Sequence, residues 1–113
     1  MIEILHNVSG KKAVFTLCDS GEALGKCECS SEADYFLIEE LDCPLPFYEG
    51  MVRAALNYAA QNGLDRALFK IPEEQISALK SSGFPVTERQ IESIAAFFAV
   101  KHCAWSAVRD KPQ

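Results

Sequence analysis

Apolar and polar residues alternate with a period of two through much of the first 43 residues, as they do in β-strands. The pattern predicts strands over residues 2–8, 13–18 and 23–30, separated by turns that contain Gly10 and Gly21. Because the turn at Gly21 is short, we expect the second and third strands to pair as a hairpin. The chain therefore begins with a strand meander.

A further run, residues 34–43, is apolar at consecutive positions until it reaches Glu39 and Glu40. Strands that are apolar on both faces are typical of a sheet with helices on each side, so we expect a central strand covered from both faces. Two adjacent carboxylates inside such a strand require an explanation. They are either functional groups or side chains that reach solvent at the end of the strand.

The second half of the chain changes to helical spacing. Apolar and small residues recur every three or four positions over residues 50–61, which predicts a helix capped by Asn62 and Gly63. The apolar run over residues 64–71 then predicts another strand. Strand, helix and strand in succession form a βαβ unit, so the strands over 34–43 and 64–71 should be parallel, with a right-handed crossover.

Two more helices are predicted in the last third of the chain. Pro72 at a first helical position, acidic residues in the next turn and Gly83 as a stop signal mark a helix between these two residues. Thr87 and Gln90 resemble a capping box at the start of a helix over about residues 88–103. The elements together predict an α+β fold around a mixed, mostly antiparallel sheet.

The composition places these elements in one globular domain, residues 1–113. With 49% hydrophobic and 24% charged residues, the chain can build one core and shows no low complexity. Its formal net charge of −5, with 11 basic residues that form no run, argues against a nucleic-acid partner. We recognise neither a secretion leader nor an apolar segment of membrane-spanning length, so a cytoplasmic protein without membrane contact is expected.

The five cysteines are expected to stay reduced. Cys27 and Cys29 would lie on one strand face without a second ligand pair, so no metal site is predicted. His102 and Cys103 are adjacent on a predicted helix, do not face each other, and are assigned a structural role. The apolar stretch 95–100 is expected to close the core, with a homodimer contact as the alternative.

The junction between residue 43 and the helix predicted from Gly50 is where we expect chemistry. In βαβ units, ligands bind beyond the carboxyl ends of the strands, next to the free N–H groups and positive dipole of the helix start. The backbone amides that a phosphate could approach are those of Gly50, Met51, Val52 and Arg53. Arg53 could also supply a positive charge, and the alternative is that Gly50 serves only a turn.

The order of elements, the pair Cys43-Pro44 that closes a strand, and the helix that follows Gly50 resemble the GCN5-related N-acetyltransferase (GNAT) superfamily. The resemblance covers roughly residues 13–84. It implies a GNAT-like fold without the first helix pair of that family, because only the segment 7–12 stands between the first two strands.

This resemblance implies acetyl-CoA as acyl donor and an amine as acceptor. The pyrophosphate would lie on the turn amides, and the pantetheine arm would pair with the backbone from Leu41 to Cys43, where the two parallel strands splay apart. The acyl group would point toward Glu39 and Glu40, either of which could accept the amine proton. The resulting hypothesis is an acetyl-CoA-dependent N-acetyltransferase that acts on an unidentified amine.

Three positions depart from the pattern of the family. Phe47 and Val52 occupy the places of the other turn markers, and Leu79 stands where a tyrosine commonly protonates the departing thiolate. A second hypothesis therefore stays open, a catalytically inactive GNAT-fold module for binding or interaction. An acceptor pocket would be open, built by another subunit, or absent.

Overall fold

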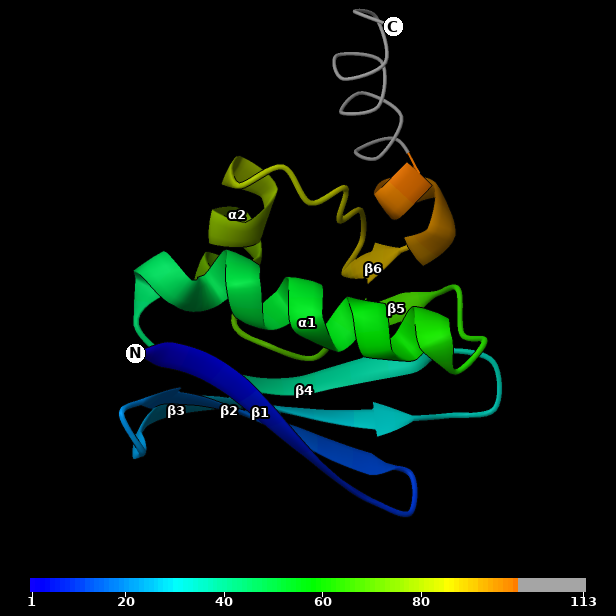
Figure 1. Ribbon diagram of the computed structural model, residues 1–113. Helices are drawn as coiled ribbons and strands as arrows, with labels where there is room; N and C mark the ends of the chain where they lie inside the picture. The colour runs from blue at the N-terminus through cyan, green and yellow to red at the C-terminus, as the bar shows by residue number, and fades with distance from the viewer. Residues whose placement is uncertain (100–113) are drawn as a thin grey trace, which may run out of the picture.

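In the computed structural model, which describes residues 1–99, six strands form one sheet in the order β1-β2-β3-β4-β5-β6 (Figure 1). The strands are β1 Ile2–Ser9, β2 Lys12–Asp19, β3 Glu22–Ser31, β4 Phe36–Asp42, β5 Ala67–Phe69 and β6 Gln90–Ile91. Neighbouring strands are antiparallel except β4 and β5, which are parallel. The predicted α+β class, the meander and the parallel pair are thereby confirmed.

Tight turns join the first three strands. Gly10 lies between β1 and β2 with a φ of 60°, so the chain passes directly from one strand to the next. Ser20 and Gly21 have φ values of 53° and 89°, the left-handed pair that a two-residue hairpin turn needs. The predicted hairpin at Gly21 therefore forms.

Helix α1, Tyr48–Gln61, crosses one face of the sheet (Figure 1). A 3-10 turn over Leu45–Phe47 leads into it, so it begins two residues before the predicted start. At its end the Asn62 side chain donates to the Tyr58 carbonyl at 2.8 Å, and Gly63 has a φ of 81°. The predicted cap is thus confirmed.

Helix α2, Glu73–Ser81, and a helical segment over residues 94–99 lie on the same side of the sheet as α1 (Figure 1). One continuous hydrophobic core fills the space between the sheet and these helices. Its largest fully buried side chains are Leu17, Phe36, Ile38, Met51, Leu56, Ile76, Leu79, Ile91 and Ile94. In the described part of the chain the sheet and the helices therefore form two layers.

The prediction that the strand over 34–43 is covered from both faces is wrong. Phe36 and Ile38 are 0% exposed, whereas Leu37 between them is half-buried. Leu37 pairs in register with Leu68 of β5 on the face that carries no described helix. Contact between these two neighbours accounts for the apolar character of that face without a second helical layer.

Strand β5 is shorter than the predicted run of residues 64–71. It pairs with β4 only from Ala67 to Phe69, and one further bond joins the Lys70 amide to the Ile38 carbonyl at 2.8 Å. The chain then turns at Pro72, which has no N–H to donate and stands just before α2. As a result β4 continues to Asp42 without a partner on that side, and the two strands splay apart.

The prediction of a helix from about residue 88 is also wrong. Thr87 and Gln90 exchange backbone hydrogen bonds of 2.8 and 3.0 Å around Glu88 and Arg89, whose φ values are 51° and 63°. This turn leads into β6, which extends the sheet instead of starting a helix.

The helix begins later and uses a different cap. Ser93 Oγ accepts the Ala96 amide at 3.0 Å, and Asp65 Oδ1 accepts the Ala95 amide at 2.8 Å. The remainder of the predicted helix, with His102 and Cys103, lies outside the described residues.

Candidate functional site

The two glutamates of β4 lie at a β-bulge. In the pairing of β3 with β4, Glu28 is opposite Glu40 and Cys29 is opposite Ile38, so Glu39 is an extra residue. A bulge re-aims the side chains around it and is frequent beside active sites. Since Cys29 and Ile38 face the core, Glu39 is turned to the uncovered face, and Glu40 is exposed. The β-bulge thus explains how two adjacent carboxylates fit this strand.

The electrostatic surroundings of the two carboxylates differ. Glu39 Oε1 lies 2.7 Å from Lys12 Nζ, and this hydrogen bond raises the pKa of the lysine. Glu40 forms no ion pair within residues 1–99, although Lys26, which is 2.6 Å from Glu28 Oε2, is close enough to feel its charge. Of the two, Glu40 is the carboxylate that no ion pair engages within residues 1–99.

Leu41 lies at the splayed end of β4, where its side chain points into the core and is 3% exposed. Its carbonyl, which has no β5 partner, accepts a hydrogen bond from Gln75 Nε2 of α2 at 2.6 Å. The same nitrogen lies 3.0 Å from the hydroxyl oxygen of Tyr48, the first residue of α1. We call the group formed by these three residues the wedge, because it fills the angle between β4 and β5.

Cys43 lies beside the wedge against β3. A β-carbon added to Gly25 would come within 2.5 Å of Cys43 Cβ and 2.6 Å of the Asp42 carbonyl oxygen. Only glycine therefore fits at position 25. Burial raises the pKa of the Cys43 thiol to about 11, so this sulfur is protonated and unreactive at neutral pH.

Gly50 lies inside α1 as its third residue. Its φ is not left-handed, and an added β-carbon would meet only Ile4 Cδ1, at 3.9 Å. Its amide is among the first four of the helix, whereas those of Val52 and Arg53 are the fifth and sixth. The Tyr48 amide already donates to the Leu45 carbonyl, so it is not open to an anion, and the side chains of Met51 and Val52 are fully buried.

The Arg53 side chain points along the helix surface. Its Nη2 donates to Glu49 Oε2 at 2.6 Å, and its guanidinium lies over the rings of Phe84 and Phe97. The acidic Glu49 stands in the first turn of α1. An anion at this helix start would therefore meet a neutralised Arg53–Glu49 pair, and its attraction would come from the backbone amides.

The wedge contains an unsatisfied polar atom. Gln75 Oε1 is buried and has no hydrogen-bond partner within residues 1–99, and it belongs to a side chain that contacts the part of β4 that has no β5 partner. The structure thus brings Leu41, Tyr48 and Gln75 together, and it turns Glu39 to the face of the sheet opposite α1.

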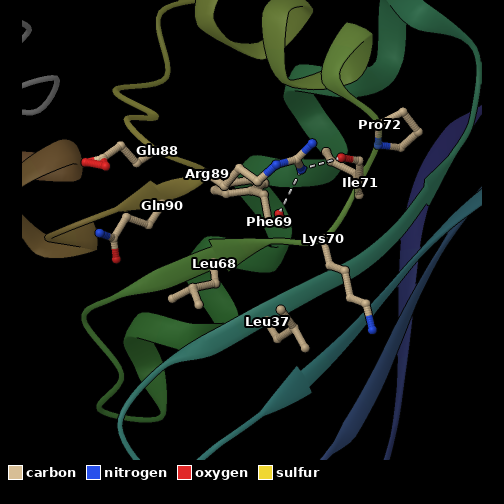
Figure 2. A pocket seen from close by; sticks show the side chains of 9 residues that line it. All are labelled: Leu37, Leu68, Phe69, Lys70, Ile71, Pro72, Glu88, Arg89 and Gln90. Carbon is tan, nitrogen blue, oxygen red and sulfur yellow. Dashed lines mark hydrogen bonds between the residues drawn. The ribbon is translucent and has the colours of Figure 1, made fainter.

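Sequence reasoning missed a groove on the uncovered face, which Figure 2 shows. Its volume is about 710 Å³, and Leu37 and Leu68 lie side by side in it, with Lys70 on the same side. Arg89 donates to the Ile71 carbonyl at 2.6 Å and lies 3.2 Å from a Glu73 oxygen. Arg89 Nη1 also lies 3.4 Å from the Phe69 carbonyl oxygen, so Arg89 ties the end of β5 to α2. Lys70, which also lines the groove, forms no ion pair within residues 1–99.

The sulfur atoms of Cys27 and Cys29 are buried and 3.7 Å apart. Their mutual hydrogen bond, together with burial, raises the pKa of Cys29. A metal ion needs thiolates, and no group of three or more metal-ligating side chains occurs within residues 1–99. The pair therefore packs beneath α1 as two small apolar groups.

The search of protein-family models gave no match to this chain, and the search of curated proteins gave no relative. Among the helices of residues 1–99, none has the length and apolar character that crossing a bilayer requires.

Proposed function

We propose that the protein is an acetyl-CoA-dependent N-acetyltransferase of the GNAT type, with the acyl donor bound at the wedge. The observation that carries this proposal is the short parallel pairing of β4 with β5, from Phe36–Ala67 to Ile38–Phe69. It leaves the end of β4 without a β5 partner beside the start of α1, where the Gln75 side chain contacts the Leu41 carbonyl. An open strand edge pairs with amide groups, and a helix start accepts phosphates.

The residues have distinct parts in this proposal. The backbone from Leu41 to Cys43 would hold the pantetheine arm, and the amides of the first α1 turn, with Gly50, would hold the pyrophosphate. The thioester supplies an activated acyl group. Glu40 would take the proton of the attacking amine, because the ion pair with Lys12 engages Glu39.

In this proposal the acceptor amine reaches the site from the uncovered face of the sheet. Glu39 and Glu40 lie at a bulge that turns toward this face, on which no described helix lies (Figure 1). An amine would approach from there, without an enclosing pocket formed by residues 1–99. This openness favours an acceptor amine carried by a larger molecule, or a pocket completed by a second subunit.

The test is calorimetric titration with acetyl-CoA. The parent protein should bind, and Gly50→Glu should weaken binding, because a carboxylate at the helix start repels the pyrophosphate. Gly50→Ala is the matched control, since the added β-carbon has room. Absence of both heat and thermal shift with the parent would remove the proposal.

Turnover is tested separately by thiol release with a panel of amines. Glu40→Gln should lower the rate about 10²-fold or more, if the carboxylate is the base. Glu39→Gln should have the smaller effect. Equal rates in both variants and the parent would remove the glutamates as bases.

A second candidate is a binding module without turnover. The core position of Leu79, which is 0% exposed, gives α2 no acid at the position where the family has its tyrosine. The apolar pair Leu37 and Leu68 in the groove gives the uncovered face a contact surface. Binding of acetyl-CoA with no thiol release for any amine would favour this candidate.

A further inference from the structure

Strand β1, Ile2–Ser9, forms one edge of the sheet (Figure 1). It pairs with β2 along its whole length, and no strand within residues 1–99 pairs with its other side. The opposite edge of the sheet is β6, which has two residues, whereas β1 has eight. An open strand edge carries a row of N–H and C=O groups that can pair with another chain. β1 is therefore the long open edge of the described sheet.

The sequence of β1 lacks the features that usually protect an edge strand. Natural edges are short, bulged, or marked by lysine or proline residues. β1 contains neither lysine nor proline, and its pairing with β2 runs without a register shift. Ile2, Leu5 and Val8 are exposed on it, and they make up half of the exposed large hydrophobic residues within residues 1–99. The edge is thus both open and apolar.

The hairpin with β2 determines which backbone groups of β1 point outward. Ser9 and Lys12 flank a two-residue turn, so this pair exchanges hydrogen bonds, and bonded and non-bonded pairs alternate from there. The bond of 3.0 Å from the Ser20 amide to the Met1 carbonyl continues the alternation at the far end. The N–H and C=O groups that face the open edge are consequently those of Ile2, Ile4, His6 and Val8.

A second copy of β1 fits this edge in an antiparallel arrangement. A two-fold axis requires that, if one residue lies opposite another, the reverse contact also occurs. With the axis at Leu5, Ile2 lies opposite Val8 of the second copy and Ile4 lies opposite His6, and each of these pairs exchanges two hydrogen bonds. An axis at Ile4 would leave Val8 unpaired, and an axis at His6 would leave Ile2 unpaired. The backbone therefore selects the register around Leu5.

The side chains agree with the same register. Leu5 lies on the uncovered face, because His6 next to it is opposite the core residue Phe15. There Leu5 meets its own equivalent, with Cβ atoms about 4.5–5.5 Å apart, and Glu3 meets Asn7 of the second copy. An exposed leucine is thereby covered, and no like charges lie opposite each other.

We propose that the protein forms a homodimer in which two copies of β1 pair antiparallel about Leu5 and join the two sheets into one. On the face that α1 crosses, Ile2 packs against Val8 of the second copy, so the exposed apolar side chains of β1 cover one another. Any extended peptide can pair with an open edge, but the agreement of hydrogen bonds, apolar pairs and charges in one register favours a second copy. This inference does not rest on acyl-CoA binding.

The first test is sedimentation of the full chain over a range of concentrations. The parent should change from the monomer of 12.5 kDa to twice this mass as its concentration rises. Leu5→Lys places two ammonium groups opposite each other and should weaken the dimer at least about tenfold. Leu24→Lys is the matched control, since Leu24 is an exposed leucine of β3, which has a strand on each side. A protein that stays monomeric, or a dimer that Leu5→Lys leaves intact, overturns the proposal.

Cross-linking tests the register. Mild oxidation of Leu5→Cys should link two copies, because opposite residues of a non-bonded pair have Cα atoms about 4.5 Å apart, within the range of a disulfide. Asn7→Cys is the control on the same face, because residue 7 lies opposite Glu3 of the second copy and away from its own equivalent. It should give no more linked dimer than the parent. Equal linking by the two variants would overturn the register around Leu5.

Amide hydrogen exchange of the parent needs no substitution. The amides of Ile4 and His6 should exchange more slowly in the dimer than at concentrations where the protein is monomeric. Those of Leu5 and Asn7, which bond to β2, should be slow at both concentrations and serve as internal controls. Slow exchange at Ile4 and His6 in the monomer would show that another part of the chain covers the edge, which contradicts the proposal.

Discussion

The two faces of the sheet differ in burial and polarity, although the same strands form both. Facing α1, Phe36 and Ile38 are fully buried in one continuous core. On the uncovered face, the neighbouring positions carry Leu37 and the ion pair of Lys12 with Glu39. The fold therefore depends on the face that α1 covers, and substitutions on the other face should cost little stability.

The largest effect should come from Phe36→Ala compared with Leu37→Ala, one residue further along β4. Loss of the fully buried ring should cost about 3–5 kcal/mol, a large part of the stability of a domain of this size. Loss of the half-buried leucine side chain should cost about 1 kcal/mol. Urea denaturation followed by circular dichroism measures both. Equal losses would mean that the uncovered face is packed in solution, for instance by a second copy.

Gly25→Ala should have the next largest effect. The added β-carbon would collide with Cys43 Cβ and with backbone atoms of Asp42 and Cys43, so the destabilisation should be about 1–3 kcal/mol. Gly50→Ala is the opposite control, because the added β-carbon has room and alanine favours a helix by up to about 1 kcal/mol. The two variants should therefore shift the urea midpoint in opposite directions. A neutral Gly25→Ala would show that the contact with residue 43 is loose.

A smaller and pH-dependent effect is expected at Glu32, which accepts a hydrogen bond of 2.6 Å from Ser30, a fully buried polar side chain. This bond, followed by the one from Lys11, lowers the pKa of Glu32 below its ordinary value of 4.5. A lowered folded-state pKa gives stability that is present above the unfolded value and lost as the pH falls through the folded value.

Glu32→Gln should therefore be less stable than the parent at pH 7, and the difference should close as the pH falls below about 4.5. Urea midpoints across this range test the sign. Glu22→Gln, at the exposed start of β3, is the control. A difference that is constant with pH would show that Glu32 acts through packing.

The strands of the meander, α1 and α2 could be predicted because their apolar spacing matches the burial that the structure shows. The same spacing could not say whether Leu37 faces a helix or the open groove, because an apolar pair on a bare sheet face has the same pattern as a buried one. The turn at Glu88 and Arg89 could not be predicted from the sequence either. Left-handed turns are predicted from glycine or asparagine, and neither stands there.

The sequence predicted the backbone elements that form the candidate site, but it did not predict which side chains contact them. The end of β4 and the start of α1 followed from the order of the elements. Gln75 did not, because it contacts Leu41 from 34 residues away, and the helical pattern marks it only as a polar residue in the first turns of α2. Contacts of this kind follow from the three-dimensional fold and are invisible to local spacing.

The smallest effect on folding is expected from breaking the Lys12–Glu39 ion pair on the uncovered face. The two charged atoms are 2.7 Å apart, but 55% of the lysine side chain is exposed, and such pairs add little to stability. Lys12→Met and Glu39→Gln should each shift the urea midpoint far less than Phe36→Ala does, and high salt should remove the difference.

At high pH, the contribution of the Lys12–Glu39 ion pair to stability should disappear. Because the folded-state pKa of Lys12 is raised above 10.5, its contribution is present below that value and is lost as the pH rises through the folded one. A double-mutant cycle at pH 8 and above pH 11 measures it. A large coupling that persists in high salt would contradict the division between the two faces, because it would make the uncovered face a second source of stability.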